Sequence, residues 1–155
     1  MATWVELTAA DIASGKPLPY TLFDKFADRD EALVDQPFRV EFAEVSQSGN
    51  TYPTFGAALV TRRIWVPASA KTLRITLKLK AGAGTAYVRG TMQGINSDEQ
   101  STTSTTYVER TITWTDLSSL RSTIGSLTLH VSNSASGNTS FLLSDDLIAA
   151  RWGFD

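Results

Sequence analysis

The sequence predicts an all-β protein: an antiparallel β-sandwich of jelly-roll type that follows an N-terminal arm with one or two short helices. Three observations lead to this prediction. From residue 57 onward, apolar and polar residues alternate in short runs, Gly, Asn, Ser and Asp separate the runs, and no long helical pattern lies between them. Such a series of short strands is typical of two packed antiparallel sheets. An immunoglobulin-like sandwich remains open as the second topology.

The 155-residue chain changes in charge and composition near residue 45. Residues 1–45 carry nine acidic and four basic side chains, a net charge of −5, whereas residues 46–155 carry seven acidic and ten basic ones, a net charge of +3. Helix-start patterns and prolines mark the first part, and Ser, Thr and alternating apolar residues mark the second. We therefore expect an arm over residues 1–37 and a β-sandwich domain over residues 38–155.

The arm contains two patterns in which a hydroxyl residue precedes an acidic residue by three positions, at Thr8 and at Thr21. Both fit the start of a helix, because the hydroxyl and the acid satisfy free backbone amides there. The second helix is expected over residues 22–34, and Pro37 ends it. A helix of this length is marginal in water, so its apolar side must pack against its own sandwich or against a neighbouring subunit.

The strands follow from the period-two alternation. Residues 38–45 alternate and form a candidate first strand, whereas residues 47–53 and 96–106 are expected to be a turn and an exposed loop. The strands expected after the turn cover residues 57–66, 73–80, 85–94, 107–115, 126–132 and 140–149. The clearest is 73–80, which predicts that the leucines and isoleucine at its odd positions face the core.

Composition excludes several classes of function. The absence of cysteine excludes disulfides and thiolate chemistry and fits a protein made in a reducing cytoplasm. A net charge of −2 argues against a nucleic-acid binder. No apolar run reaches the length of a membrane span, and the first residues contain neither the basic nor the apolar part of a signal peptide. We expect no cofactor, no nucleic acid and no membrane partner.

The sequence offers no catalytic constellation. His130 is the single histidine, it is expected to face outward from its strand, and no nucleophile-elbow motif accompanies it. The acidic residues 98 and 99 fall in the expected exposed loop, where they serve solvation. We therefore predict no enzyme and no metal centre, with Asp145 and Asp146 as the nearest candidates for an oxygen-liganded calcium ion.

Cationic and aromatic side chains gather on the predicted solvent side of the strands. Such groups on a rigid sheet bind sugars or anionic surfaces by stacking and by charge-assisted hydrogen bonds, although a solvated sheet face has the same composition. The residues of this possible ligand face are Arg74, Lys78, Tyr87, Arg89 and Tyr107.

Residues 4–33, from Trp4 through the Thr-Ala-Ala-Asp-Ile turn and Gly-Lys-Pro-Leu to Asp-Glu-Ala-Leu, resemble the N-terminal segments of virion proteins of tailed bacteriophages. The β part looks like the jelly rolls of phage decoration and fibre proteins, and equally like carbohydrate-binding modules. The resemblance implies a capsid decoration (cement) or head-fibre protein without enzymatic activity, located in the virion, trimeric, and bound to the major capsid protein or another virion subunit. The alternative is a carbohydrate-binding module of a tail or fibre component that touches a glycan on the host surface.

Under the virion hypothesis, the apolar side chains of the arm make the contacts with the shell or with a neighbouring subunit. Burial of several such side chains on each of three arms would accumulate binding energy. The residues expected to do so are Trp4, Leu7, Ile12, Leu18, Leu22, Phe23 and Phe26.

Overall fold

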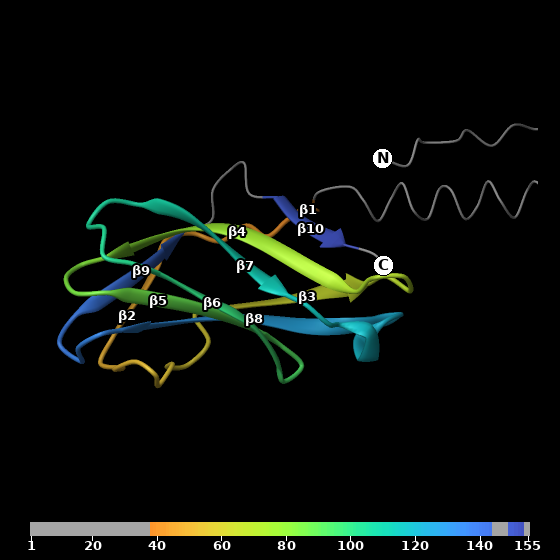
Figure 1. The fold of residues 1–155 in the computed structure, drawn as a ribbon, viewed down its shortest axis with the longest axis horizontal. Helices are drawn as coiled ribbons and strands as arrows, with labels where there is room; N and C mark the ends of the chain where they lie inside the picture. Colours follow the sequence, from red (N-terminus) through yellow and green to blue (C-terminus); the bar gives the residue numbers. More distant parts are fainter. Residues whose placement is uncertain (1–37, 144–148, 154–155) are drawn as a thin grey trace, which may run out of the picture. The chain divides into compact units, whose positions relative to one another are not determined.

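The computed structural model describes residues 38–143 and 149–153, which form two antiparallel β-sheets arranged as a sandwich (Figure 1). The chain divides into two units, Met1–Gln36 and Pro37–Asp155, and all described residues belong to the second. The elements in chain order are β1 (Phe38–Arg39), β2 (Val45–Ser48), β3 (Val60–Val66), β4 (Thr72–Ala81), β5 (Ala86–Met92), β6 (Ile95–Thr102), β7 (Val108–Trp114), the 3-10 helix η2 (Ser118–Leu120), β8 (Thr123–Asn133), β9 (Thr139–Leu143) and β10 (Ala149–Gly153).

The first sheet, sheet A, is built around the long strand β4. Strand β7 pairs along one edge of β4, and β10 and β9 pair in succession along the other, where Ile75 lies opposite Ala150 and Lys78 opposite Leu143. Strands β1 and β2 then pair with β10 and β9, respectively. The second sheet, sheet B, has the strand order β3-β8-β5-β6. The all-β, two-sheet prediction is therefore confirmed.

The core lies between the inner faces of the two sheets, as the alternation predicts. Leu73, Ile75, Leu77 and Leu79 of β4 are at most 1% exposed. Strand β8 contributes alternate residues from the other sheet in the same way, since Leu127, Leu129 and Val131 are fully buried. Burial of each such side chain contributes on the order of 1.5–3 kcal/mol, so this interleaved core is the main source of stability.

Trp114, at the end of β7, is the largest fully buried side chain among the described residues. Its Nε1 donates to the backbone carbonyl of Ile95 on β6, at 3.0 Å. The indole thus connects an edge strand of sheet A to an edge strand of sheet B. The buried polar atom is satisfied while the ring fills the core.

Two sequence predictions are wrong in this part of the chain. Residues 96–106 were expected to be a loop, but β6 covers Ile95–Thr102 and pairs with β5, with Ser97 and Thr102 buried. A polar edge strand with one solvated side lacks the apolar alternation on which the loop prediction relied. The strand expected over residues 57–66 begins only at Val60, because residues 49–59 form a loop.

Several predictions lie outside the described residues. These are the two arm helices, the arm contacts from Trp4 to Phe26, and the calcium candidates Asp145 and Asp146. The segment expected as one strand over residues 140–149 contains the strands β9 and β10 on either side of residues 144–148. Within the described ranges, no helix has the length and hydrophobicity that a membrane crossing requires.

Candidate functional site

The five residues of the predicted ligand face lie on two different sheets. Tyr87 and Arg89 point outward from β5 of sheet B, where Arg89 pairs in register with Glu99 of β6. Arg74 and Lys78 point outward from β4 of sheet A, and Tyr107 directly precedes β7 of the same sheet. The structure therefore brings Tyr87 and Arg89 together and separates them from the other three.

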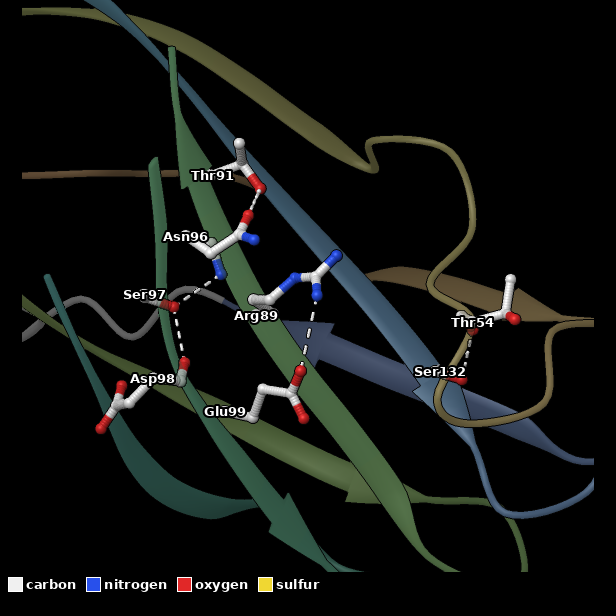
Figure 2. Close-up of polar contacts among 9 residues, drawn as sticks. Thr54, Arg89, Thr91, Asn96, Ser97, Asp98, Glu99 and Ser132 are labelled. Atoms are coloured by element: carbon white, nitrogen blue, oxygen red, sulfur yellow. Dashed lines mark hydrogen bonds and ion pairs between the residues drawn. The ribbon is translucent and has the colours of Figure 1, made fainter. Parts of the chain in front are cut away.

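The loop of residues 49–59 covers part of the outer face of sheet B, and strand β8 holds it there. The Tyr52 amide donates to the Asn133 carbonyl at 2.8 Å, and the Leu59 amide donates to the Leu129 carbonyl at 2.9 Å. Between these points, Ser132 Oγ donates to the Thr54 carbonyl at 2.8 Å (Figure 2). These bonds fix the loop at both ends and in the middle.

His130 serves the same loop. Its Nδ1 lies 2.9 Å from the carbonyl oxygen of Gly56, and its Nε2 lies 3.0 Å from Thr128 Oγ1. One ring nitrogen is thus engaged by a backbone carbonyl and the other by a threonine hydroxyl on the same strand. His130 is therefore a structural residue that fastens the loop to β8.

The anchored loop presents an aromatic stack at the surface. The ring of Tyr52 stacks on that of Tyr87 with centroids 4.1 Å apart and an interplanar angle of 16°. Phe55 meets Tyr52 edge-on at 6.2 Å. Tyr52 remains 40% exposed, so a flat aromatic surface faces solvent at this place.

Charged groups adjoin the stack. The guanidinium of Arg89 lies over the Phe55 ring, 4.4 Å from its centroid, and its Nη1 is 3.5 Å from Glu99 Oε1. Glu99 also raises the pKa of Tyr52, first by accepting a hydrogen bond from its hydroxyl and then by its charge. The Arg89 Nε is buried and has no hydrogen-bond partner among the described residues. We call Tyr52, Phe55, Tyr87, Arg89 and Glu99 the Arg89 cluster.

An irregularity in the β5–β6 ladder shapes the polar edge of this cluster. The register shifts between Arg89 and Thr91, and the Gly90 amide donates to Ser97 Oγ at 2.9 Å. Thr91 Oγ1 donates to Asn96 Oδ1 at 2.9 Å, so the amide of Asn96 lies beside the cluster on the same strand as Glu99 (Figure 2). A bulge at a sheet edge typically redirects side chains in this way.

A second cluster lies on sheet A. Lys80 Nζ is 4.4 Å from the ring centroids of both Tyr107 and Phe141 and 3.7 Å from Glu44 Oε2. The hydroxyl of Tyr107 donates a short hydrogen bond to the same carboxylate. Burial, and then this carboxylate, hold the pKa of Tyr107 far above its usual value. Lys80, Tyr107, Phe141 and Glu44 are therefore engaged in contacts with one another.

Asp98, one of the two adjacent acidic residues of β6, has a structural role between the two sheets. Asp98 accepts from the Thr113 amide at 2.6 Å and from Gln100 at 3.1 Å, so its carboxylate connects β6 to β7. No group of three or more His, Asp or Glu side chains within residues 38–143 and 149–153 is placed to hold a metal ion. The arrangement can stack on a flat ligand and exchange hydrogen bonds with it.

Sequence reasoning missed three members of the Arg89 cluster. Tyr52 and Phe55 lie in a segment taken as a turn and its flank, and Glu99 lies in a segment taken as a loop. The available signal was the Tyr-Pro-Thr-Phe run, because two aromatic residues in a Gly- and Asn-rich loop need a surface on which to pack.

Comparison with protein-family models and with curated proteins finds no match. Among solved structures, the chain is similar to the CBM36-1 domain of a multidomain xylanase from the hindgut metagenome of Trinervitermes trinervoides. The sequence identity is 14% and the TM-score is 0.46, over 72% of this chain and 98% of that one.

Proposed function

We propose that this chain is a non-enzymatic structural subunit of a tailed-bacteriophage particle, which decorates the capsid and is attached through residues 1–37. The observation that carries the proposal is the resemblance of residues 4–33 to the N-terminal segments of phage virion proteins. Its partners are the major capsid protein or other virion subunits, and it acts as a homotrimer.

The β-sandwich supports a role as a domain that projects from the surface of the particle. The described residues of the second unit contain a hydrophobic core, with buried side chains from Val40 to Trp152. A domain with its own core can project from a particle without help from its attachment segment.

The strand order supports the jelly-roll interpretation. If β1 and β2 count as one broken strand and β9 and β10 as another, the described residues form eight strands. Sheet A then contains the first, eighth, third and sixth strands, and sheet B the second, seventh, fourth and fifth. This alternation between sheets is the order that two nested Greek keys produce.

Removal of residues 1–37 tests the proposal. The 38–155 fragment should keep the sheet signal in circular dichroism but lose trimer mass in light scattering. Antibodies raised against the sandwich should label phage particles released by the cells that encode the chain. A monomeric full chain together with unlabelled particles would contradict the proposal.

The alternative function, glycan binding, is favoured by the Arg89 cluster. It combines an exposed tyrosine ring with a guanidinium, a carboxylate and the nearby amide of Asn96. An aromatic ring stacks on the apolar face of a sugar, and planar polar groups exchange hydrogen bonds with its hydroxyls.

Two variants of the full chain test this alternative on a glycan array. Tyr52→Ala removes the exposed ring, and Arg89→Gln removes the charge but keeps a donor. Both should reduce the signal of any glycan that the unaltered chain binds, whereas Arg74→Gln, an exposed arginine on sheet A, should not. Equal signals from all three variants would show that the Arg89 cluster only anchors the loop.

A further inference from the structure

An apolar pair is exposed on the outer face of sheet B, away from the Arg89 cluster. Trp65 of β3 is 58% exposed and Ile124 of β8 is 51% exposed, and the two are direct partners in the antiparallel register. Side chains that face each other in this way have Cβ atoms about 5 Å apart. Single exposed hydrophobic residues are ordinary, but an adjacent pair forms a continuous platform.

The backbone holds this pair outside the core. Val66, next to Trp65, is fully buried, and Gly125, next to Ile124, is buried against Met92. A shift of the register by one residue would expose these neighbours and expel the rest of the β3 and β8 core residues. The exposure of Trp65 and Ile124 is therefore a fixed property of the fold.

The platform adjoins a cationic side chain, that of Arg63. Arg63 precedes Trp65 by two residues, so it lies on the same face, opposite Ser126. The other outward residues of β3 and β8 are uncharged or histidine, and no ion pair of Arg63 is found within the described part of the chain.

The acidic residues of sheet B lie at its opposite edge, on β6. Glu99 pairs with Arg89, and Asp98 accepts the Thr113 amide. Neither carboxylate is available to neutralise Arg63. One described acidic residue that contacts β3 is Glu41, whose carbonyl oxygen accepts from Arg62 Nη2 at 2.8 Å. Strand β3 has two arginines, Arg62 and Arg63, so its charge favours a negative ligand at this edge.

The size of the platform argues for a small ligand. A stable protein–protein interface buries about 800 Å² on each partner around a hydrophobic centre. Here two apolar side chains are surrounded by Arg63, Ser126, Thr61 and Thr128. A pyranose ring matches this surface, because it has one apolar C–H face and a rim of hydroxyls.

We propose that Trp65, Ile124 and Arg63 form a binding site for a carboxylate-bearing sugar such as a uronic acid. The indole and the Ile124 side chain receive the C–H face of the ring. The guanidinium binds the sugar carboxylate through two parallel hydrogen bonds, and the Ser126 hydroxyl is placed to bond with a ring substituent. The site depends neither on attachment to a particle nor on the Arg89 cluster.

Titration calorimetry of the full chain tests the site with oligogalacturonate, oligomannuronate and the methyl ester of the first. The ester keeps the rings and removes the charge. At least one acidic oligomer should bind, more weakly as salt rises. Arg63→Gln should weaken that binding at least about tenfold, because the charge and the pair of parallel hydrogen bonds are lost and a single neutral amide donor remains. It should leave the weak binding of the ester unchanged.

Variants of the platform separate its role from that of charge alone. Trp65→Ala should abolish binding, and Trp65→Tyr should restore part of it because a flat ring returns. Arg74→Gln on sheet A and Arg89→Gln in the other cluster should bind as the unaltered chain does. Because Trp65 is exposed, its variants should keep the thermal midpoint of the unaltered chain.

Three results would overturn the proposal. The first is that neither acidic oligomer binds, and the second is that acid and ester bind with equal affinity. The third is that Trp65→Ala lowers the oligomer mass or abolishes particle attachment while sugar binding stays unchanged. The last would identify the platform as a protein interface. Attachment that survives Trp65→Ala but fails without residues 1–37 would leave the proposed virion function intact whatever the sugar result.

Discussion

Substitution of Gly90 by alanine should be among the most destabilising single-methyl changes in the sandwich. Gly90 lies on β5 with its α-carbon toward the core, directly beneath the polar edge of the Arg89 cluster. A Cβ atom built there would overlap Cζ2 and Cη2 of Trp114 and would lie 3.1 Å from Ile112 Cδ1. The indole cannot turn aside freely, because its Nε1 is bonded to the Ile95 carbonyl.

The magnitude follows from these contacts. Overpacking of a rigid core costs about 1–3 kcal/mol, and loss of the indole hydrogen bond adds about 1 kcal/mol. Alanine recovers about 0.5–1 kcal/mol because it restricts the unfolded chain more than glycine does. We expect Gly90→Ala to lower the free energy of unfolding by about 2–3 kcal/mol, measured by urea denaturation at constant m value.

Gly125→Ala is the matched control on the neighbouring strand β8. Gly125 is also buried, but its added Cβ would meet Met92, with the sulfur at 3.1 Å and Cγ at 3.2 Å. A methionine side chain can change rotamer, so we expect a cost below about 1 kcal/mol. In a Trp114→Phe background the two overlapped ring atoms are gone, and Gly90→Ala should cost less than in the unaltered chain. Equal costs for the two glycines, or no coupling to Trp114, would refute this account of the core.

Two further predictions concern polar groups. Asn133→Ala should lower the free energy of unfolding by about 2 kcal/mol. The reason is that the buried side-chain amide of Asn133 donates to the Ala83 carbonyl and to Ser140 Oγ, both at 3.1 Å. A loss below about 0.5 kcal/mol in urea denaturation would contradict this prediction. Burial and Glu44 raise the pKa of Tyr107, so above pH about 10 the unfolded chain ionises this tyrosine while the folded chain keeps its proton. The free energy of unfolding should therefore fall as the pH rises beyond about 10, and should fall less in Tyr107→Phe; identical pH profiles would exclude this contribution.

The sequence predicted the core well because burial alternates with a period of two residues. In β4 and β8 every second residue is apolar, so Leu73 and Leu127 could be assigned to the interior without knowledge of their partners. Strand β6 was missed because its residues are polar on both sides, and its place is fixed by pairing with β5 rather than by its own composition. A period-two pattern detects a strand only where one side is apolar.

The candidate site was harder to predict, because alternation tells which residues face outward but not from which sheet. Arg74 and Arg89 both belong to outward positions of strong strands, yet β4 and β5 lie in different sheets. The ring of Tyr52 stacks on Tyr87 because β8 holds the loop of residues 49–59 over sheet B. This stacking is a contact between segments that are distant in the sequence. Such contacts depend on the crossover of the chain, and a single sequence carries little information about it.

Parts of the two outer faces differ in how the described side chains contact one another, and this difference bears on where the proposed ligands would bind. On sheet A, Thr76 bonds to Thr111 at 2.9 Å, and Lys80 is enclosed by two rings and a carboxylate. A ligand at Thr76 or Lys80 would have to displace these partners before gaining a contact, so binding at that part of sheet A would gain little free energy. On sheet B, the rings of Tyr52 and Trp65 are exposed and Arg63 has no counter-charge among the described residues, so a ligand gains contacts without breaking any. Ligand binding should therefore respond to changes on β3, β8 and β5 rather than to changes on β4 and β7.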